Sequence, residues 1–416
     1  MSDIKKDKQK LLYYFYVVFM NLSMVSMVAN LYFKHLGFSF TQIGILFGFL
    51  QIGKMVFEIP TGFIADRYGN RSSLLLSLAL QMSGYLLMAL IHSFSAMICI
   101  LFLLAISYTL MTGCATAIIT NRLIQADRKD ELTQLNAVSR VLFYTCYGVA
   151  ALAVGFLLEV GYELVFGISI VSLALAFLCI FFIEDESAHL SKKKQIRPQD
   201  AIRYIFQNPI IFYFSLVEAA AAWSMVPVDK FYNNYLHEHF GFPLSRVGIV
   251  ISVQFIIVSF LGLYSSKLSQ RINENILVRM GPVFMMIAFF LFALSENPVL
   301  AISMYFSGLA AFCLSNPVSS KLFQVNISST FRVTVISFKS ILLALLASVS
   351  QPLFGLISDK YEMRQAMMLL IAISFFFILA INLVFRKLNF TSEAKSEVAR
   401  ERLRSEERRV GKECRS

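Results

Sequence analysis

The sequence predicts an all-α membrane protein with twelve transmembrane helices in two pseudo-symmetric bundles of six. Hydrophobic residues fill 57% of the 416 positions, charged residues only 15%, and the mean hydropathy is +0.67, far above the values of soluble domains. Apolar runs of about 20 residues, long enough to cross the hydrocarbon core as helix, recur along the chain. The alternating short segments of a membrane β-barrel do not occur, so a helical bundle is expected.

Twelve apolar runs define the expected spans. They are residues 11–33, 41–65, 72–91, 95–119, 136–158, 164–183, 209–232, 245–268, 276–294, 298–320, 334–357 and 366–385. The polar segment 184–205 follows the sixth run, so we expect it to be a cytoplasmic linker between two halves, 1–183 and 206–389. The tail 390–416 is charged, and its end, RSEERRVGKECRS, resembles a translated sequencing adapter; the alternative is a genuine basic tail.

Basic residues divide unevenly between the two sides of the membrane. With the N-terminus inside, 22 Lys and Arg residues fall in inner segments and five in outer loops, namely Lys34, Lys230, Arg246, Lys360 and Arg364. The positive-inside rule therefore predicts a multi-pass protein of the plasma membrane with both termini cytoplasmic. Orientation thus explains the net charge of +11, and nucleic acid is not an expected partner. The first span has no small-residue cleavage site before it and is expected to stay uncleaved.

An internal repeat divides the chain at the same place. YFKHLGFSFTQIGIL, from Tyr32, aligns without gaps with LHEHFGFPLSRVGIV, from Leu236, at an offset of 204 residues. The shared positions are His35 and His239, Gly37-Phe38 and Gly241-Phe242, and Gly44 and Gly248. A weaker match joins GFIADRYGNR with GLYSSKLSQR, 200 residues later. Both copies lie in spans of the same direction, so the halves are expected to be parallel repeats about an axis along the membrane normal.

A polar segment, EIPTGFIADRYGNR, interrupts the apolar sequence between the second and third runs. Gly62 would permit close helix approach, and Gly69 the positive φ of a tight turn. Asp66 at the membrane boundary can accept hydrogen bonds from the start of another helix, while Arg67 and Arg71 can bind carboxylates or lipid phosphates. The segment therefore predicts a breakable latch. Ordinary positive loop charges would explain the arginines but not the glycines and the aspartate.

This pattern resembles the cytoplasmic signature between the second and third helices of the major facilitator superfamily. The preceding EIPTG, which begins at Glu58, is similar to a bacterial efflux-type branch that includes drug:proton antiporters, and with the spans and the repeat the resemblance covers about residues 11–387. It implies two six-helix bundles around a central cavity and rocker-switch alternating access. It also implies that Asp66, Arg67 and Arg71 hold the cytoplasmic side closed.

Three features depart from the antiporter pattern. Thr109 occupies the place of a fourth-helix arginine, and the fifth helix has YGVAALAVG without a glycine-proline pair. Thr120 and Asn121 replace a tyrosine and an aspartate that often end the fourth helix in the efflux-type branch. These departures weaken the expectation of proton antiport.

Ionisable residues inside the spans are functional candidates, since each costs roughly 2.5–3.5 kcal/mol at a helix centre. Lys54 and Glu58 lie one turn apart and are expected to pair locally, although a separate role for Lys54 stays open. Glu218 has no opposite charge on its own helix. It is expected either to exchange a proton during transport or to pair with Lys54 or Lys339 across the bundle interface. Arg140, near the inner end of the fifth span, completes the set.

Polar residues in the spans that line the family's cavity are weaker candidates for substrate contacts. They are Asn21, Asn30, Thr109, Trp223 and Asn316. Hydrogen bonding between helices is the commoner role of such residues and remains the alternative.

These patterns favour a secondary transporter that exports small amphipathic compounds in exchange for protons, acting as a monomer in the lipid bilayer. Uptake or facilitated diffusion of a small polar solute is the alternative. A membrane-embedded enzyme or lipid-handling protein is disfavoured, because the sparse intramembrane charges supply no convergent catalytic set. The sequence has no phosphate-binding P-loop, and its cysteines have no metal-ligand spacing, so neither ATP nor a metal or other cofactor is expected.

Overall fold

The computed structural model describes residues 2–112, 114–125, 131–183, 204–268, 272–327 and 332–388, which form helices joined by short turns without any β-strand. The first half contains α1 (Ser2–Asn21), α2 (Val25–His35), α3 (Phe40–Tyr68), α4 (Asn70–Leu90), α5 (Phe94–Met111), α6 (Cys114–Gln125), α7 (Glu131–Val160) and α8 (Tyr162–Phe181). The second half contains α10 (Pro209–Asn234), the π-helical turn η1 (Tyr235–His239), α11 (Leu244–Leu268), α12 (Glu274–Leu294), α13 (Pro298–Asn326), α14 (Arg332–Lys360) and α15 (Met363–Val384). Most of the predicted linker and the whole tail from residue 390 lie outside the described residues.

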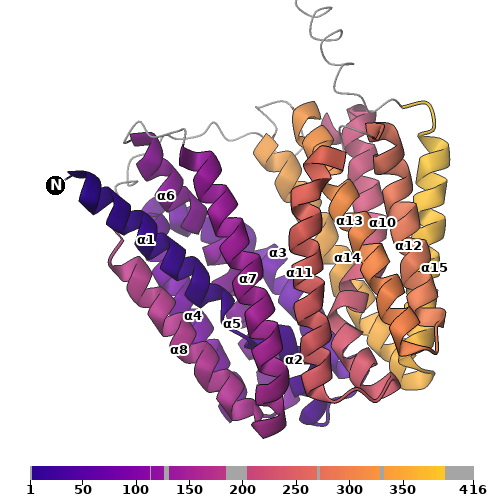
Figure 1. Cartoon of the computed structure of the whole chain (residues 1–416), viewed down its shortest axis with the longest axis horizontal. Helices are drawn as coiled ribbons and strands as arrows, with labels where there is room; N and C mark the ends of the chain where they lie inside the picture. Colours follow the sequence, from indigo (N-terminus) through magenta and orange to yellow (C-terminus); the bar gives the residue numbers. More distant parts are fainter. Residues whose placement is uncertain are drawn as a thin grey trace, which may run out of the picture.

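Twelve segments of the described chain are long and apolar enough to cross a membrane, which confirms the predicted fold class. The first six and the last six form two bundles that lie side by side and separate toward one face (Figure 1). We name this the termini face, because α1 begins there and α15 ends there, and we name the opposite one the distal face. The sequence predicts that the termini face is cytoplasmic.

Three spans differ from the prediction. The first is broken between Asn21 and Val25, and the fourth is interrupted after Met111. The seventh runs to His239 because α10 continues into η1. Placing Lys230 in an outer loop was therefore wrong: it lies nine residues, about two and a half turns, before the end of this span.

The predicted repeat has a structural counterpart in the turns that follow its helices. Gly37 and Gly241 both have a positive φ, +84° and +64°, where a side chain would be strained. The offset of 204 residues also relates Asn30 to Asn234, and these two residues hydrogen-bond to each other at 2.6 Å. A contact between equivalent residues of two repeats is expected near the pseudo-two-fold axis. The halves therefore meet across this axis at α2 and α10.

Equivalent glycines of the repeat bring helices of opposite halves together near the distal face. A Cβ on Gly44 of α3 would lie 2.8 Å from Pro352 Cα of α14. On Gly248 of α11, it would lie 2.8 Å from Gly155 Cα of α7. Each contact is too close for any larger residue, as at other small-residue helix crossings in membranes. The two crossings, α3 with α14 and α7 with α11, thus close the distal side of the molecule.

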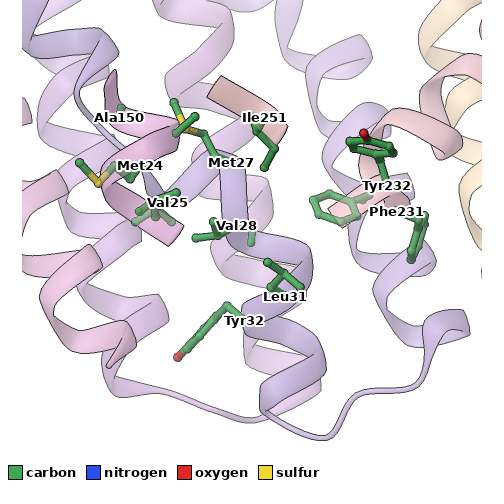
Figure 2. Close-up of a cluster of buried hydrophobic side chains, with 14 of the residues drawn as sticks. Met24, Val25, Met27, Val28, Leu31, Tyr32, Ala150, Phe231, Tyr232 and Ile251 are labelled. Carbon is green, nitrogen blue, oxygen red and sulfur yellow. The ribbon is translucent and has the colours of Figure 1, made fainter. Parts of the chain in front are cut away.

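The buried apolar core, like the helix crossings, joins the two halves toward one face of the molecule. Its main cluster contains residues of both halves, and Figure 2 shows part of it, including Val28 and Leu31 of α2, Phe231 of α10 and Ile251 of α11. A second cluster lies within the second half only, around Tyr213, Phe214, Val278 and Phe323. The described core therefore joins the halves toward the distal face and leaves them separate toward the termini face.

Candidate substrate cavity and gates

A large cavity, which we call the main cavity, lies among the helices of the first half. Its volume is about 840 Å³, and its polar lining includes Asn21, Ser26, Gln81, Tyr108, Arg140 and Tyr147. Amides, hydroxyls and aromatic rings can bind a small molecule that has both apolar and polar parts. Among the predicted residues, the cavity candidate Asn21 and the coupling candidate Arg140 line this cavity, and their roles stay predictions.

The break in the first span shapes one wall of this cavity. Two serines of α8 form hydrogen bonds with the backbone around the break: Ser169 accepts one from Met24 N at 2.9 Å, and Ser172 donates one to Phe19 O at 3.0 Å. Such side chains make irregular backbone possible at membrane depth. Ser23, within the break, lines the cavity, and its buried hydroxyl has no hydrogen-bond partner among the described residues.

A second pocket, which we call the lysine pocket, adjoins the main cavity through Ser26 and Tyr108, which line both. Its volume is about 170 Å³. Lys54 of α3 and Lys230 of α10 both line it, so it receives one cation from each half. Each ammonium lies over an aromatic ring, that of Lys54 at 5.0 Å from Tyr108 and that of Lys230 at 5.8 Å from Phe47.

A third pocket, of about 100 Å³, lies within the second half and holds an ion pair. Lys339 of α14 and Glu218 of α10 line it, and Lys339 Nζ donates to Glu218 Oε2 at 2.7 Å. The Glu218 side chain is 41% exposed and that of Lys339 18%, so the pair is accessible from the pocket. Asn316 also lines this pocket, as a substrate-contact residue would.

The structure corrects the predicted pairing of the membrane charges. Lys54 and Glu58 form no ion pair, although they lie one turn apart, because the Lys54 ammonium lies over the Tyr108 ring in the lysine pocket. Glu218 does pair with Lys339, as one alternative proposed. Both residues belong to the second half, however, so the pair does not cross the interface between the halves.

Three of the predicted polar residues, Asn30, Thr109 and Trp223, form contacts within the protein. Asn30 is buried and donates to Lys230 O and Asn234 Oδ1, each at 2.6 Å, so it joins the halves and does not face a cavity. Thr109 donates to carbonyls of its own helix. The indole of Trp223 packs against the core, and its buried N–H has no partner among the described residues.

At the distal face, an acidic residue in each half caps a helix of the other half. The carboxylate of Asp359, near the end of α14, accepts from Phe40 N at 2.9 Å and from Thr41 N at 2.7 Å at the start of α3. Glu159, near the end of α7, accepts from Ser245 N at 3.2 Å at the start of α11. Thr41 and Ser245 are equivalent in the repeat, 204 residues apart. Two pseudo-symmetric caps, each favoured by the helix dipole, therefore hold the distal face closed.

The predicted latch lies at the termini face and spans the turn between α3 and α4. Gly69 has the expected positive φ, +86°. The close approach predicted at Gly62 is absent in this conformation, since no described atom lies within 4 Å of its Cβ position. Arg71 donates to the carbonyls of Ile180 and Phe181 at the end of α8, within its own half.

The other two latch residues make no contact across the halves. Asp66 and Arg67 are exposed, and Arg67 lies over the neighbouring Tyr68 ring, 5.5 Å from its centroid. Asp66 forms no hydrogen bond or ion pair with the residues that the structure describes. Because the latch is expected to act when the termini face is closed, its role stays a prediction.

Several residues of the site were not predicted from the sequence. Lys230, Gln351 and Asn234 were missed, as were the two capping acids. The repeat offset could have identified Asn234 and the capped positions, because it relates them to Asn30 and Thr41. No sequence signal places Gln351 beside Lys54, since this neighbourhood depends on how α14 crosses α3.

Comparison with known proteins identifies the family. Residues 11–338 match the model of the Major Facilitator Superfamily. The chain is similar to the uncharacterized MFS-type transporter YxaM of Bacillus subtilis, with 22% identity over 348 residues that cover 81% of this chain and 85% of that protein. The chain therefore belongs to the Major Facilitator Superfamily and is a membrane transporter.

Solved structures share this fold. A variant of the nucleoside transporter NupG has a TM-score of 0.77 and 16% identity, covering 91% of this chain and 99% of that one. A bacterial homologue of the human lysosomal transporter Spinster, in an inward-facing and occupied conformation, has a TM-score of 0.71 and 15% identity, covering 94% and 99%. These likenesses support the two-bundle architecture.

Proposed function

We propose that this chain is a secondary active transporter of the bacterial plasma membrane that works by rocker-switch alternating access. The observation that carries the proposal is the asymmetry of the interface between the halves. Helix crossings, the Asn30–Asn234 bond and two carboxylate caps join the halves at the distal face, and the main cavity lies on the other side of that closure. With the termini face cytoplasmic, this arrangement is an inward-facing state.

We further propose that the transporter exports small amphipathic compounds. The efflux-type EIPTG sequence before the latch supports export, and the lining of the main cavity, with tyrosine rings beside amides and hydroxyls, suits such compounds. The transporter is expected to act as a monomer, because each chain has both halves and a cavity of its own.

Proton coupling is proposed to act through Glu218. A proton that binds this carboxylate removes its charge and releases Lys339, so proton binding would change the packing of α10 against α14. Since α10 also binds α2 through Asn234, a change at Glu218 can reach the interface between the halves. This chain of contacts supports a link between protonation and gating.

Flux measurements in everted vesicles test export and coupling together. A panel of fluorescent dyes and radiolabelled sugars is followed with and without a pH gradient, and proton-driven accumulation of at least one dye is expected. Glu218→Gln should abolish the gradient-driven part of this flux. The double variant Glu218→Gln with Lys339→Met is the control, because it removes both charges and leaves no unpaired lysine. Full gradient-driven flux in either variant would remove Glu218 from the mechanism, and sugar uptake without dye export would replace export with uptake.

A further inference from the structure

The lysine pocket has an unusual charge composition for a site inside a membrane protein. Lys54 and Lys230 both line it, and the positive charge of Lys230 acts on Lys54. None of the described residues that line it is acidic, and neither lysine forms an ion pair in the described part of the chain. Two cations of like sign therefore share about 170 Å³ without a counter-charge, an arrangement that costs free energy unless an anion enters.

Lys54 cannot be explained as a residue that reaches water at a membrane surface. Lys54 lies 14 residues from each end of α3, which is about 21 Å of helix, farther than a lysine side chain extends. The adjacent Asp229 does not line the pocket, and it forms no ion pair with either lysine among the described residues. Glu58, one turn from Lys54, makes no bond to it. Both ammonium groups thus remain available to a ligand.

Gln351 provides a second, independent sign of a ligand. It lines the lysine pocket from α14, its side chain is 0% exposed, and neither its amide nitrogen nor its amide oxygen has a hydrogen-bond partner among the described residues. Buried amides almost always form hydrogen bonds, because an unpaired one is costly. Its N–H₂ group can donate to an oxyanion held between the two ammonium groups.

The rest of the wall defines the body of the ligand. Phe47, Leu50 and Leu104 present apolar surface, while Ser26 and Tyr108 connect the pocket to the main cavity. The volume equals about six water molecules at roughly 30 Å³ each, enough for one acidic group and a few carbon atoms. A larger apolar part can extend into the main cavity.

We infer that the lysine pocket binds the acidic group, a carboxylate or a phosphate monoester, of a small amphipathic organic anion that the protein transports. Lys54, Lys230 and Gln351 hold the anion, and Phe47 and Leu50 contact its apolar part. Lys54 comes from the first half and Lys230 and Gln351 from the second, so a bound anion links the halves and favours the closed distal face. This inference rests on the proposed transport function, whose substrate class it specifies.

Binding to the purified full-length protein in lipid nanodiscs tests the inference. Trp223 is the sole tryptophan of the chain and lies on α10 with Lys230, so a change in its fluorescence serves as the signal of binding in nanodiscs whose scaffold protein has no tryptophan. The probes are benzoate, phenyl phosphate and benzamide, the last being a neutral analogue of benzoate. We expect saturable binding of benzoate, phenyl phosphate or both, and binding of benzamide at least roughly tenfold weaker, since it cannot form charge-assisted contacts. The benzoate and phenyl phosphate arms separate the two acidic groups.

Two variants and a matched control locate the site. Lys54→Gln and Lys230→Gln should each weaken anion binding roughly tenfold or more and leave the melting temperature without ligand unchanged or higher, because each removes an unpaired charge. Lys321→Gln is the control, since Lys321 is exposed and pairs with Glu274 at 3.0 Å, away from the pocket. The Lys321→Gln variant should bind the anions with the same affinity as the unsubstituted protein.

The outcomes separate this inference from the transport proposal. If no anion binds, if benzamide binds as tightly as benzoate, or if Lys54→Gln retains affinity within about twofold, the anion site is wrong. Flux of neutral dyes in vesicles would leave the transport function intact in that case. If benzoate binds through Lys54 and Lys230 but vesicles carry no solute, the site stands and the transport proposal fails.

Discussion

At the distal face, α3 and α11 begin against carboxylates of the opposite half, and their glycines lie against the backbones of α14 and α7. At the termini face, the end of α3 carries an exposed Asp66 and a Gly62 with no described atom near its Cβ position. The same helix is therefore bound to the other half at one end and separate from it at the other. In the proposed alternating access, the distal contacts compete with contacts that close the termini face.

Each half contributes one carboxylate cap at the distal face, whereas the complete latch sequence occurs only in the first half. Asp359 and Glu159 cap equivalent positions of the repeat, so closure at the distal face is shared by both halves. The second copy of the latch segment, GLYSSKLSQR, lacks an aspartate and runs into residues outside the described part of the chain. The comparison implies that the distal face contributes more to the balance between the two states, and the following changes test this implication.

The largest effect is expected from the distal glycines. Gly44→Ala and Gly248→Ala each insert a Cβ that would lie 2.8 Å or less from backbone atoms of the opposite half, so the closed distal face should lose about 1–3 kcal/mol, and its open population should rise roughly 5- to 150-fold. The readout is the reaction rate of Leu31→Cys, a buried α2 position, with an impermeant maleimide in a cysteine-free background. Gly167→Ala is the control, because no described atom lies within 4 Å of its Cβ position. Equal rates in all three variants would contradict the role of Gly44 and Gly248 in closing the distal face.

An intermediate effect is expected from the capping acids. Asp359→Asn weakens two short hydrogen bonds at a helix start, worth about 1 kcal/mol, so the same cysteine should react about fivefold faster. Glu159→Gln weakens one bond of 3.2 Å and should increase the rate only about twofold. A larger effect of Glu159→Gln than of Asp359→Asn would show that the number and length of these hydrogen bonds do not determine how much each cap stabilises the closed distal face.

The smallest effect is expected from the latch, and with the opposite sign. If Asp66 stabilises the state with a closed termini face, Asp66→Asn should disfavour the open distal face and slow the reaction at Leu31→Cys about twofold, since an exposed helix-dipole contact is worth roughly 0.3–1 kcal/mol. A faster reaction would mean that Asp66 does not stabilise the state in which the termini face is closed and the distal face is open.

The sequence predicted the elements of this protein well because each depends on local chemistry. Apolar length identified the twelve spans, and the turn at Gly69 required a residue that tolerates positive φ. The residues that lie between the halves were harder. Asn30 was a candidate for substrate contact with hydrogen bonding between helices as the alternative, and it bonds to its own repeat equivalent, a contact that exists only when the halves are assembled.

Lys230 shows the other physical reason for a missed site. The predicted seventh span ended at residue 232, directly before Asn233 and Asn234, but both residues bond to the first half, Asn233 through Met27 O at 2.9 Å. Polar residues that are satisfied across an interface do not end a membrane helix, so α10 continues and keeps Lys230 inside it. Similarly, the i,i+4 spacing of Lys54 and Glu58 permits a pair, but the lysine pocket offers Lys54 an aromatic ring and an open cavity instead.

Alternating access is tested most directly by two distances measured in one protein. Spin labels at His92→Cys and Val299→Cys report the distal face, and labels at Arg67→Cys and Gln324→Cys report the termini face; all four residues are exposed, and each pair joins the two halves. Pulsed electron paramagnetic resonance in nanodiscs is recorded with and without Asp359→Asn. The account predicts that the variant lengthens the distal distance and shortens the termini distance together. Distances that stay fixed, or that lengthen at both faces, would contradict it.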